Sequence, residues 1–124
     1  MSKARPKHLN LLQIRQPVPA VVSILHRISG ALLFLFLWLF LAALERSLVS
    51  AESFADLKAN FGNPLVKLMG LGLLWAYLHH AFAGLRHLGL DLRLGIDLPK
   101  ARASAYAVLV LGFGLTLVIG VMLW

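Results

Sequence analysis

Ionisable side chains stand inside two otherwise apolar stretches of this sequence, where burying a charge is unfavourable unless the group has a specific role. The second stretch carries most of them and the first adds an adjacent pair: His79, His80, Arg86 and His87, with His26 and Arg27. Imidazole can ligate a metal or carry a proton, and arginine can neutralise a carboxylate. Because the sequence contains no cysteine, a redox cofactor here would have to be held by His or Met.

Helical periodicity separates the two adjacent histidines. His79 points about 100° away from a face that is formed by Gly72, Ala76, His80 and Gly84. This face presents one imidazole with little side-chain bulk around it, as a flat macrocycle would need in order to approach the backbone. The alternative is that the small residues make only helix contacts and that His80 hydrogen-bonds to a neighbouring helix.

Depth along the helix gives a second argument for a bound macrocycle. His80 lies six residues before Arg86, or about 9 Å deeper at helical rise. A porphyrin on His80 could therefore extend its propionates to the membrane surface. The groups that would neutralise them lie at comparable depth: His26, Arg27, Arg86 and His87. For Arg86 the alternative is a helix-end arginine that reaches the interface without a ligand.

Ser23, one turn before Arg27, adds a hydroxyl that could bind a small polar ligand.

Another pattern of small residues lies in the last apolar stretch. Gly112, Thr116 and Gly120 repeat at four-residue spacing. This spacing predicts a packing face toward another helix and no cofactor role.

Three apolar stretches are long enough to position these groups in a membrane, since a bilayer core of about 30 Å needs about 20 helical residues. They cover about residues 19–44, 64–88 and 103–124. The composition agrees, because 60% of the 124 residues are hydrophobic and 14% are charged, where soluble domains have roughly 25% charged residues. The predicted fold class is therefore all-α integral membrane with three transmembrane helices, in one membrane-anchor domain over 1–124. Between the first two helices we expect a short polar connection with one helical turn.

The charge distribution predicts the orientation of the chain. Twelve Lys and Arg against five Asp and Glu give a net charge of +7, which in a soluble protein would suggest a nucleic-acid partner. Nine of the twelve cations, however, fall on the side of residues 1–18 and of the connection near 89–102. The positive-inside rule then makes that side cytoplasmic and the C-terminus periplasmic, and it accounts for the charge without nucleic acid.

The motifs around these residues resemble the larger, cytochrome b membrane-anchor subunit of bacterial succinate dehydrogenase, the respiratory complex II type. The resemblance covers the whole chain and is most specific in Arg5-Pro6 with Leu9-Asn10-Leu11, in SILHRISG at 23–30, and in HAFAGLRHL at 80–88. Such an anchor is a multi-pass protein of the bacterial cytoplasmic (inner) membrane. It packs with a second anchor subunit around haem b.

The resemblance also implies roles for single residues. His80 matches the axial ligand of haem b, whose second ligand comes from the other anchor subunit. Ser23 and Arg27 match the ubiquinone site, and His26 with Arg27 match residues near the haem propionates. No role is implied for His79.

The implied function belongs to a complex of four kinds of subunit. A flavoprotein with FAD oxidises succinate, an iron–sulfur protein carries electrons to the membrane, and the two anchors dock this pair and help to form the site of ubiquinone reduction, linking the tricarboxylic acid cycle to aerobic electron transport. The isolated chain is not expected to be catalytic. Two alternatives remain, the anchor of a quinol:fumarate reductase and a cofactor-free membrane assembly or scaffold protein.

Overall fold

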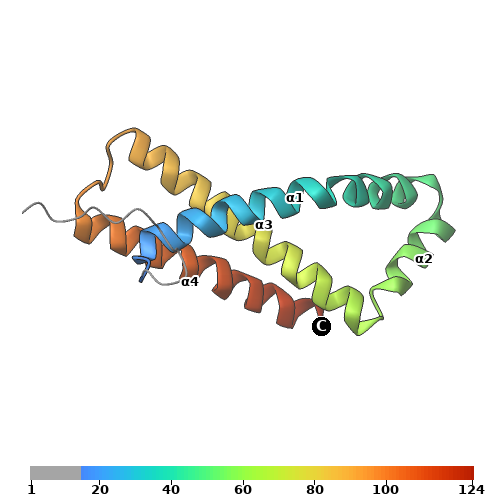
Figure 1. The fold of residues 1–124 in the computed structure, drawn as a ribbon. Coiled ribbons are helices and arrows are strands. Elements are labelled where there is room, and N and C mark those ends of the chain that lie inside the picture. Colours follow the sequence, from blue (N-terminus) through green and yellow to red (C-terminus); the bar gives the residue numbers. More distant parts are fainter. Residues whose placement is uncertain (1–14) are drawn as a thin grey trace, which may run out of the picture.

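The computed structural model describes residues 15–124, and this part of the chain is helical apart from short connections. Its elements, shown in Figure 1, are α1 (Val18–Val49), α2 (Ala51–Asn60), α3 (Pro64–Asp91) and α4 (Leu98–Leu123). Most of the expected N-terminal segment, including the Arg5-Pro6 motif, lies outside the described residues.

Three of these helices are long and apolar enough to cross a membrane: α1 with 32 residues, α3 with 28 and α4 with 26. Their large apolar side chains are mostly exposed, for example Phe34 at 75%, Leu117 at 68% and Val121 at 81%. Such a surface is stable in lipid and would aggregate in water. The prediction of an all-α fold with three transmembrane helices is confirmed.

Local signals explain where these helices begin and end. Each has a proline in its first turn, where no intrahelical partner is lost: Pro19, Pro64 and Pro99. At the end of α3, the Arg93 N–H donates to the Leu90 carbonyl and the Leu94 N–H donates to the Gly89 carbonyl, both at 2.9 Å. These two bonds form a Schellman motif in which Arg93 takes a left-handed conformation with φ of 61°.

The connection between α1 and α3 is more ordered than we expected from the sequence. The connection contains more helix than the one turn that we predicted, because α2 has ten residues. Ser50 and Ser53 cap it reciprocally: the Ser53 N–H donates to Ser50 Oγ at 3.1 Å, and the Ser50 N–H donates to Ser53 Oγ at 3.2 Å. Glu52 in the first turn and Lys58 in the last turn also complement the helix dipole.

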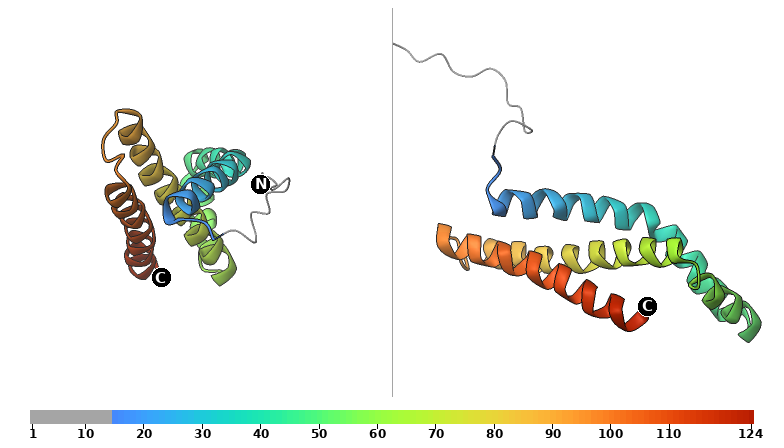
Figure 2. Two further views of the ribbon diagram at one scale, coloured as in Figure 1. Left: turned by 60° about the vertical axis from the view of Figure 1, so that its left-hand side comes forward. Right: turned by 90° about the horizontal axis from the view of Figure 1, so that it is seen from below.

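In the arrangement of the spans, α3 packs against both α1 and α4. The start of α1, the end of α3 and the start of α4 share one end of the bundle, and α2 lies at the other end (Figure 1). Toward its C-terminus α4 diverges from α1 (Figure 2). The buried apolar core is small and combines the three spans near the shared end: Val22, Ala83, Ala105 and Val108. The functional candidates from α1 and α3 lie beside this core.

Candidate functional site

The His80 side chain extends from α3 to α1 and is anchored by one ring nitrogen. His80 Nδ1 lies 3.0 Å from the His26 carbonyl oxygen and 3.4 Å from Ser29 Oγ. Because a carbonyl oxygen can only accept a hydrogen bond, Nδ1 must carry the proton and donate it. No described residue forms a hydrogen bond with Nε2, so that nitrogen keeps its lone pair. A histidine held in this way is arranged as metal-ligating histidines usually are.

Gly30 on α1 allows this close approach. A Cβ atom built at Gly30 would lie 2.8 Å from His80 Cε1, closer than real Cβ atoms come, and 3.2 Å from Nδ1, which is a tight contact. Gly30 has no predicted role in the sequence. Its position one turn after His26 is the signal that could have found it, because it places Gly30 beside the same neighbouring helix.

His26 lies between two other imidazoles. Its ring stacks on His80 with a centroid distance of 4.2 Å and on His87 with one of 4.9 Å. His87 Nδ1 donates to the Ala83 carbonyl oxygen at 2.7 Å. A Cβ at Gly84 would lie 3.5 Å from His26 Nε2, so the His26 ring covers that glycine.

Stacked rings do not direct their nitrogens at one point. Accordingly, no group of three or more His, Cys, Asp or Glu side chains within residues 15–124 is arranged to hold a metal ion. This part of the chain can offer a metal one imidazole nitrogen at a time, from His80 in particular. The remaining ligands would have to come from a macrocycle or from another chain.

The small-residue face of α3 does not form one bare stripe. Ala76 is 1% exposed and packed against other helices, whereas a Cβ at Gly72 would meet nothing within 4 Å. Since Gly84 lies under His26, the free space around His80 depends on α1 as well as on the small residues of α3.

Ser23 and Arg27 stand one turn apart on α1, near the end of the bundle at which α1 begins. Ser23 is half-buried and Arg27 is exposed. Among residues 15–124, neither side chain forms a hydrogen bond with another residue. Within the part of the chain that the structure describes, both polar groups are therefore open to a ligand that approaches this end of the bundle.

Arg86 lies apart from the histidine stack, because its side chain turns toward α4. Its Nε donates to Ser104 Oγ at 3.0 Å, and its Nη2 donates to the Ala101 carbonyl oxygen at 3.2 Å. The structure therefore groups His26, His80, His87 and Gly84, and it places Arg86 on the other side of α3.

His79 is fully buried on the side of α3 that faces α4. A Cβ at Gly112 would lie 3.6 Å from His79 Cα, and the His79 ring stacks on Trp75 at 5.2 Å. Neither of its ring nitrogens, nor the indole nitrogen of Trp75, has a hydrogen-bond partner among the described residues. The two adjacent histidines thus serve different faces of α3, as the helical periodicity predicts.

Comparison with known proteins identifies the family. Residues 1–119 match the family described as succinate dehydrogenase/fumarate reductase transmembrane subunit. The chain belongs to this family. The match covers all three spans apart from the last residues of α4, and it includes both motifs that carry His26 and His80. The family and the three apolar spans together make the chain a multi-pass bacterial membrane protein, as we predicted.

Individual members of the family agree with the predicted resemblance. The succinate dehydrogenase cytochrome b556 subunit of Coxiella burnetii is 42% identical over 125 residues, covering 100% of both chains. The subunit of the same name from Paracoccus denitrificans is 31% identical over 85% of this chain and 81% of its own. The succinate dehydrogenase 2 membrane subunit SdhC of Mycobacterium tuberculosis is 38% identical over 53% of this chain and 48% of its own. The resemblance to a cytochrome b anchor subunit of succinate dehydrogenase is therefore confirmed.

Proposed function

We propose that this family member is the haem b-binding membrane anchor of a succinate:ubiquinone oxidoreductase. In this proposal it assembles with a flavoprotein, an iron–sulfur subunit and a second anchor, and it contributes to the site of ubiquinone reduction. The names of the relatives, which are cytochrome b556 subunits of succinate dehydrogenase, support the haem and the direction of the reaction. The family description also covers fumarate reductases, and none of the three relatives carries that name.

The geometry of His80 is the observation that carries this proposal. Its Nδ1–H donates to the His26 carbonyl, so Nε2 keeps the lone pair with which it would hold a haem iron. Imidazoles that do not converge on one point suit a haem, whose porphyrin would supply four ligands, better than a bare metal ion, and the remaining ligand would come from the second anchor. A haem bound here would supply a one-electron redox centre.

The neighbouring residues have distinct tasks in this proposal. His26 and His87 line the space beside His80 with flat rings, and Gly84 leaves room for them. Arg27 places a fixed positive charge where the haem propionates would lie. Arg86 can add its charge from the α4 side only through the part of its guanidinium that is not bound to Ser104 and Ala101.

Ser23 and Arg27 have the chemistry that quinone reduction requires. The reaction takes two electrons and two protons, and it builds negative charge on the quinone oxygens. A hydroxyl donor and a guanidinium stabilise that charge best where water is excluded and the donors are already oriented. We therefore assign the hydrogen bond to Ser23 and the charge to Arg27.

The test is the reduced-minus-oxidised absorbance spectrum of the assembled complex with His80→Leu. We expect the b-type band to be lost or strongly changed, because the His80 ring is held between α1 and α3, whereas the His87 ring is bonded only to a carbonyl of its own helix. His79→Leu is the matched control, since it changes the adjacent histidine on the other face of α3 and should leave the band in place. A full, unshifted band in the His80→Leu complex would refute the assignment and favour a cofactor-free scaffold.

A further inference from the structure

The buried hydroxyl of Ser29 lies where the His80 ring meets α1. Ser29 is fully buried, and its Oγ donates to the His26 carbonyl oxygen at 2.9 Å. The same oxygen accepts the His80 Nδ1–H at 3.0 Å, and Ser29 Oγ lies 3.4 Å from that nitrogen. Ser29 Oγ, the His26 oxygen and His80 Nδ1 thus form a triangle between α1 and α3. Neither the proposed haem ligand nor the proposed quinone donors include this hydroxyl.

The His26 carbonyl oxygen serves more donors than it has lone pairs, since a carbonyl oxygen has two. Besides the Ser29 hydroxyl and the His80 ring, the backbone N–H of Gly30 points at this oxygen, because α1 is helical throughout this turn. Donors that share one oxygen draw on the same electron density, so each bond is weaker than it would be alone. Ser29 therefore limits how strongly His80 can donate its Nδ1 proton.

The strength of this donation affects how well the opposite ring nitrogen binds a metal. An imidazole that donates strongly through Nδ1 is more basic at Nε2. A more basic axial ligand stabilises ferric over ferrous haem, and hydrogen bonds behind the ligand are one means by which a protein sets the reduction potential. We propose that Ser29 is a positioning residue that raises the reduction potential of a haem held by His80, because its hydroxyl takes part of the acceptor capacity of the His26 carbonyl. This inference rests on the proposed haem site.

A second serine of α1 shows what is particular to Ser29. Ser47 Oγ donates to the Leu44 carbonyl oxygen at 2.7 Å, also three residues earlier on the same helix. Such bonds are a usual way for a helical serine to satisfy its hydroxyl. Ser47 lies near the other end of α1, and no other side chain among the described residues donates to the Leu44 carbonyl. The two serines therefore differ in whether a histidine shares the acceptor, and they form a matched pair.

The test is a redox titration of the haem in the assembled complex, followed by its b-type absorbance. We expect Ser29→Ala to keep the haem and to lower its midpoint potential. The equilibrium constant for reduction should fall about threefold, toward the low end of what one hydrogen bond contributes. Ser29→Cys has a weaker donor of similar shape, and should lower the potential by less. Ser47→Ala removes the equivalent bond and should leave the potential unchanged.

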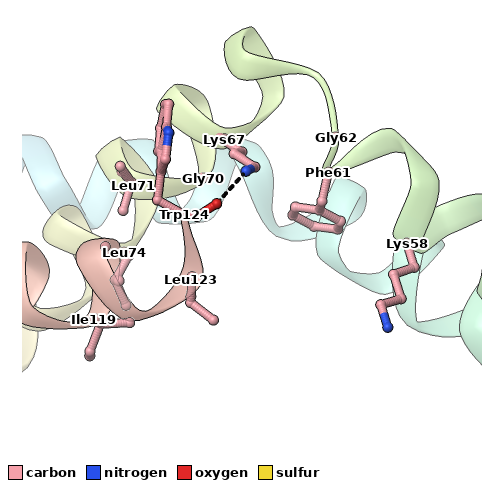
Figure 3. A pocket seen from close by; sticks show the side chains of 11 residues that line it. Lys58, Phe61, Gly62, Lys67, Gly70, Leu71, Leu74, Ile119, Leu123 and Trp124 are labelled. Atoms are coloured by element: carbon pink, nitrogen blue, oxygen red, sulfur yellow. Dashed lines mark hydrogen bonds between the residues drawn. The ribbon is translucent and has the colours of Figure 1, made fainter.

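A second control loosens the spans at the far end of the bundle. Lys67 in the first turn of α3 donates from Nζ to the backbone oxygen of Trp124 at 3.0 Å, and the ammonium group lies 4.9 Å from the centre of the Trp124 ring (Figure 3). Lys67→Met removes both interactions and should leave the haem potential unchanged. A shift equal to that of Ser29→Ala would show that the potential follows helix packing in general, and would overturn the proposal.

The remaining outcomes separate this inference from the proposed function. An unchanged or raised potential in Ser29→Ala, or an equal shift in Ser47→Ala, would refute the role of Ser29. Loss of the haem from Ser29→Ala would show that the hydroxyl builds the site and does not tune it, which also contradicts the proposal. If His80→Leu loses the band while Ser29→Ala has the wild-type potential, His80 stays the ligand and only the role of Ser29 is refuted. A band that persists in His80→Leu refutes the haem assignment itself.

Discussion

At the scale of single residues, the backbone of α1 determines the state of the His80 ring. The His26 carbonyl fixes which nitrogen carries the proton, and Gly30 gives the ring room to reach that carbonyl. Ser29, which is fully buried, donates to the same carbonyl oxygen at 2.9 Å and keeps it oriented. A histidine on a bare helix would lose this orientation to side-chain rotation, so α1 orients the proposed haem ligand that α3 supplies.

Replacing Gly30 by Ala tests this preparation. The added methyl would lie 2.8 Å from His80 Cε1, so the ring must turn away and its bond to the His26 carbonyl must lengthen or break. We expect a shifted or weakened b-type band in the complex, measured by the difference spectrum and by the haem content. Gly114→Ala adds the same methyl in open space and should leave the spectrum unchanged. An unaltered spectrum in Gly30→Ala would mean that the His80 ring is placed differently in the complex.

Replacing Ser23 by Ala or Arg27 by Gln tests the quinone site that we propose. Loss of an oriented donor to a developing negative charge commonly costs about 100-fold in rate. We expect ubiquinone reduction by succinate to fall by about that factor, while succinate oxidation by a dye that accepts electrons at the soluble subunits stays nearly intact. Arg102→Gln removes an exposed cation from the same end of the bundle and serves as the control. An equal loss of both activities would indicate failed assembly and not a missing donor.

Part of the site follows from the sequence, because helical spacing sets the angle between residues of one helix. The helical spacing predicts that His80 and His87 lie on one face of α3 and His79 on another, and the structure has this arrangement. Which neighbour each face meets is a matter of tertiary packing. The His26 carbonyl and the Gly30 contact therefore had no signal in the spacing of α3, and neither did the turn of Arg86 toward α4.

At the scale of the elements, the long spans could be predicted and the short helix could not. A span in lipid must satisfy its backbone internally, so apolar length alone indicates a helix. The helix α2 is polar and has no such signal, and its stability comes from the caps at Ser50 and Ser53. The close packing of α4 on α3 could also be predicted, from the small residues of α4. Gly112 and Gly120 are both buried against α3.

Substitutions at Gly112 measure that closeness. Ala at this position would make ordinary contacts of 3.6 to 3.8 Å with His79, and we expect it to be tolerated. Leu cannot fit against the His79 backbone, and overpacking of this kind commonly costs about 1–3 kcal/mol. We therefore expect Gly112→Leu to lower the midpoint temperature at which the purified complex aggregates, and Gly114→Leu not to do so. Equal midpoints for the two Leu variants would show that α4 is not held closely against α3.

At the scale of the whole molecule, the chain is incomplete by itself. Its buried apolar core is confined to a few residues near one end, while Phe34, Trp38 and many other large side chains are exposed along the spans. Lipid can cover much of this surface. The polar groups around His80 need a different neighbour, since an imidazole lone pair facing acyl chains would be unsatisfied. We therefore assign the polar face around His80 to the second anchor and the apolar faces of the spans to the bilayer.

The orientation of the whole chain is open to a direct test. Nine of the twelve cations lie on the side where α1 begins and α3 joins α4, and basic residues close to span ends stay in the cytoplasm. We therefore expect alkaline phosphatase, which folds only in the oxidising periplasm, to be active when fused after Trp124 and inactive when fused after Ile96. A fluorescent protein that folds only in the cytoplasm should give the opposite pattern at the same two positions. Phosphatase activity at Ile96 would invert the topology, and it would move Ser23 and Arg27 away from the side on which we propose that an iron–sulfur subunit docks.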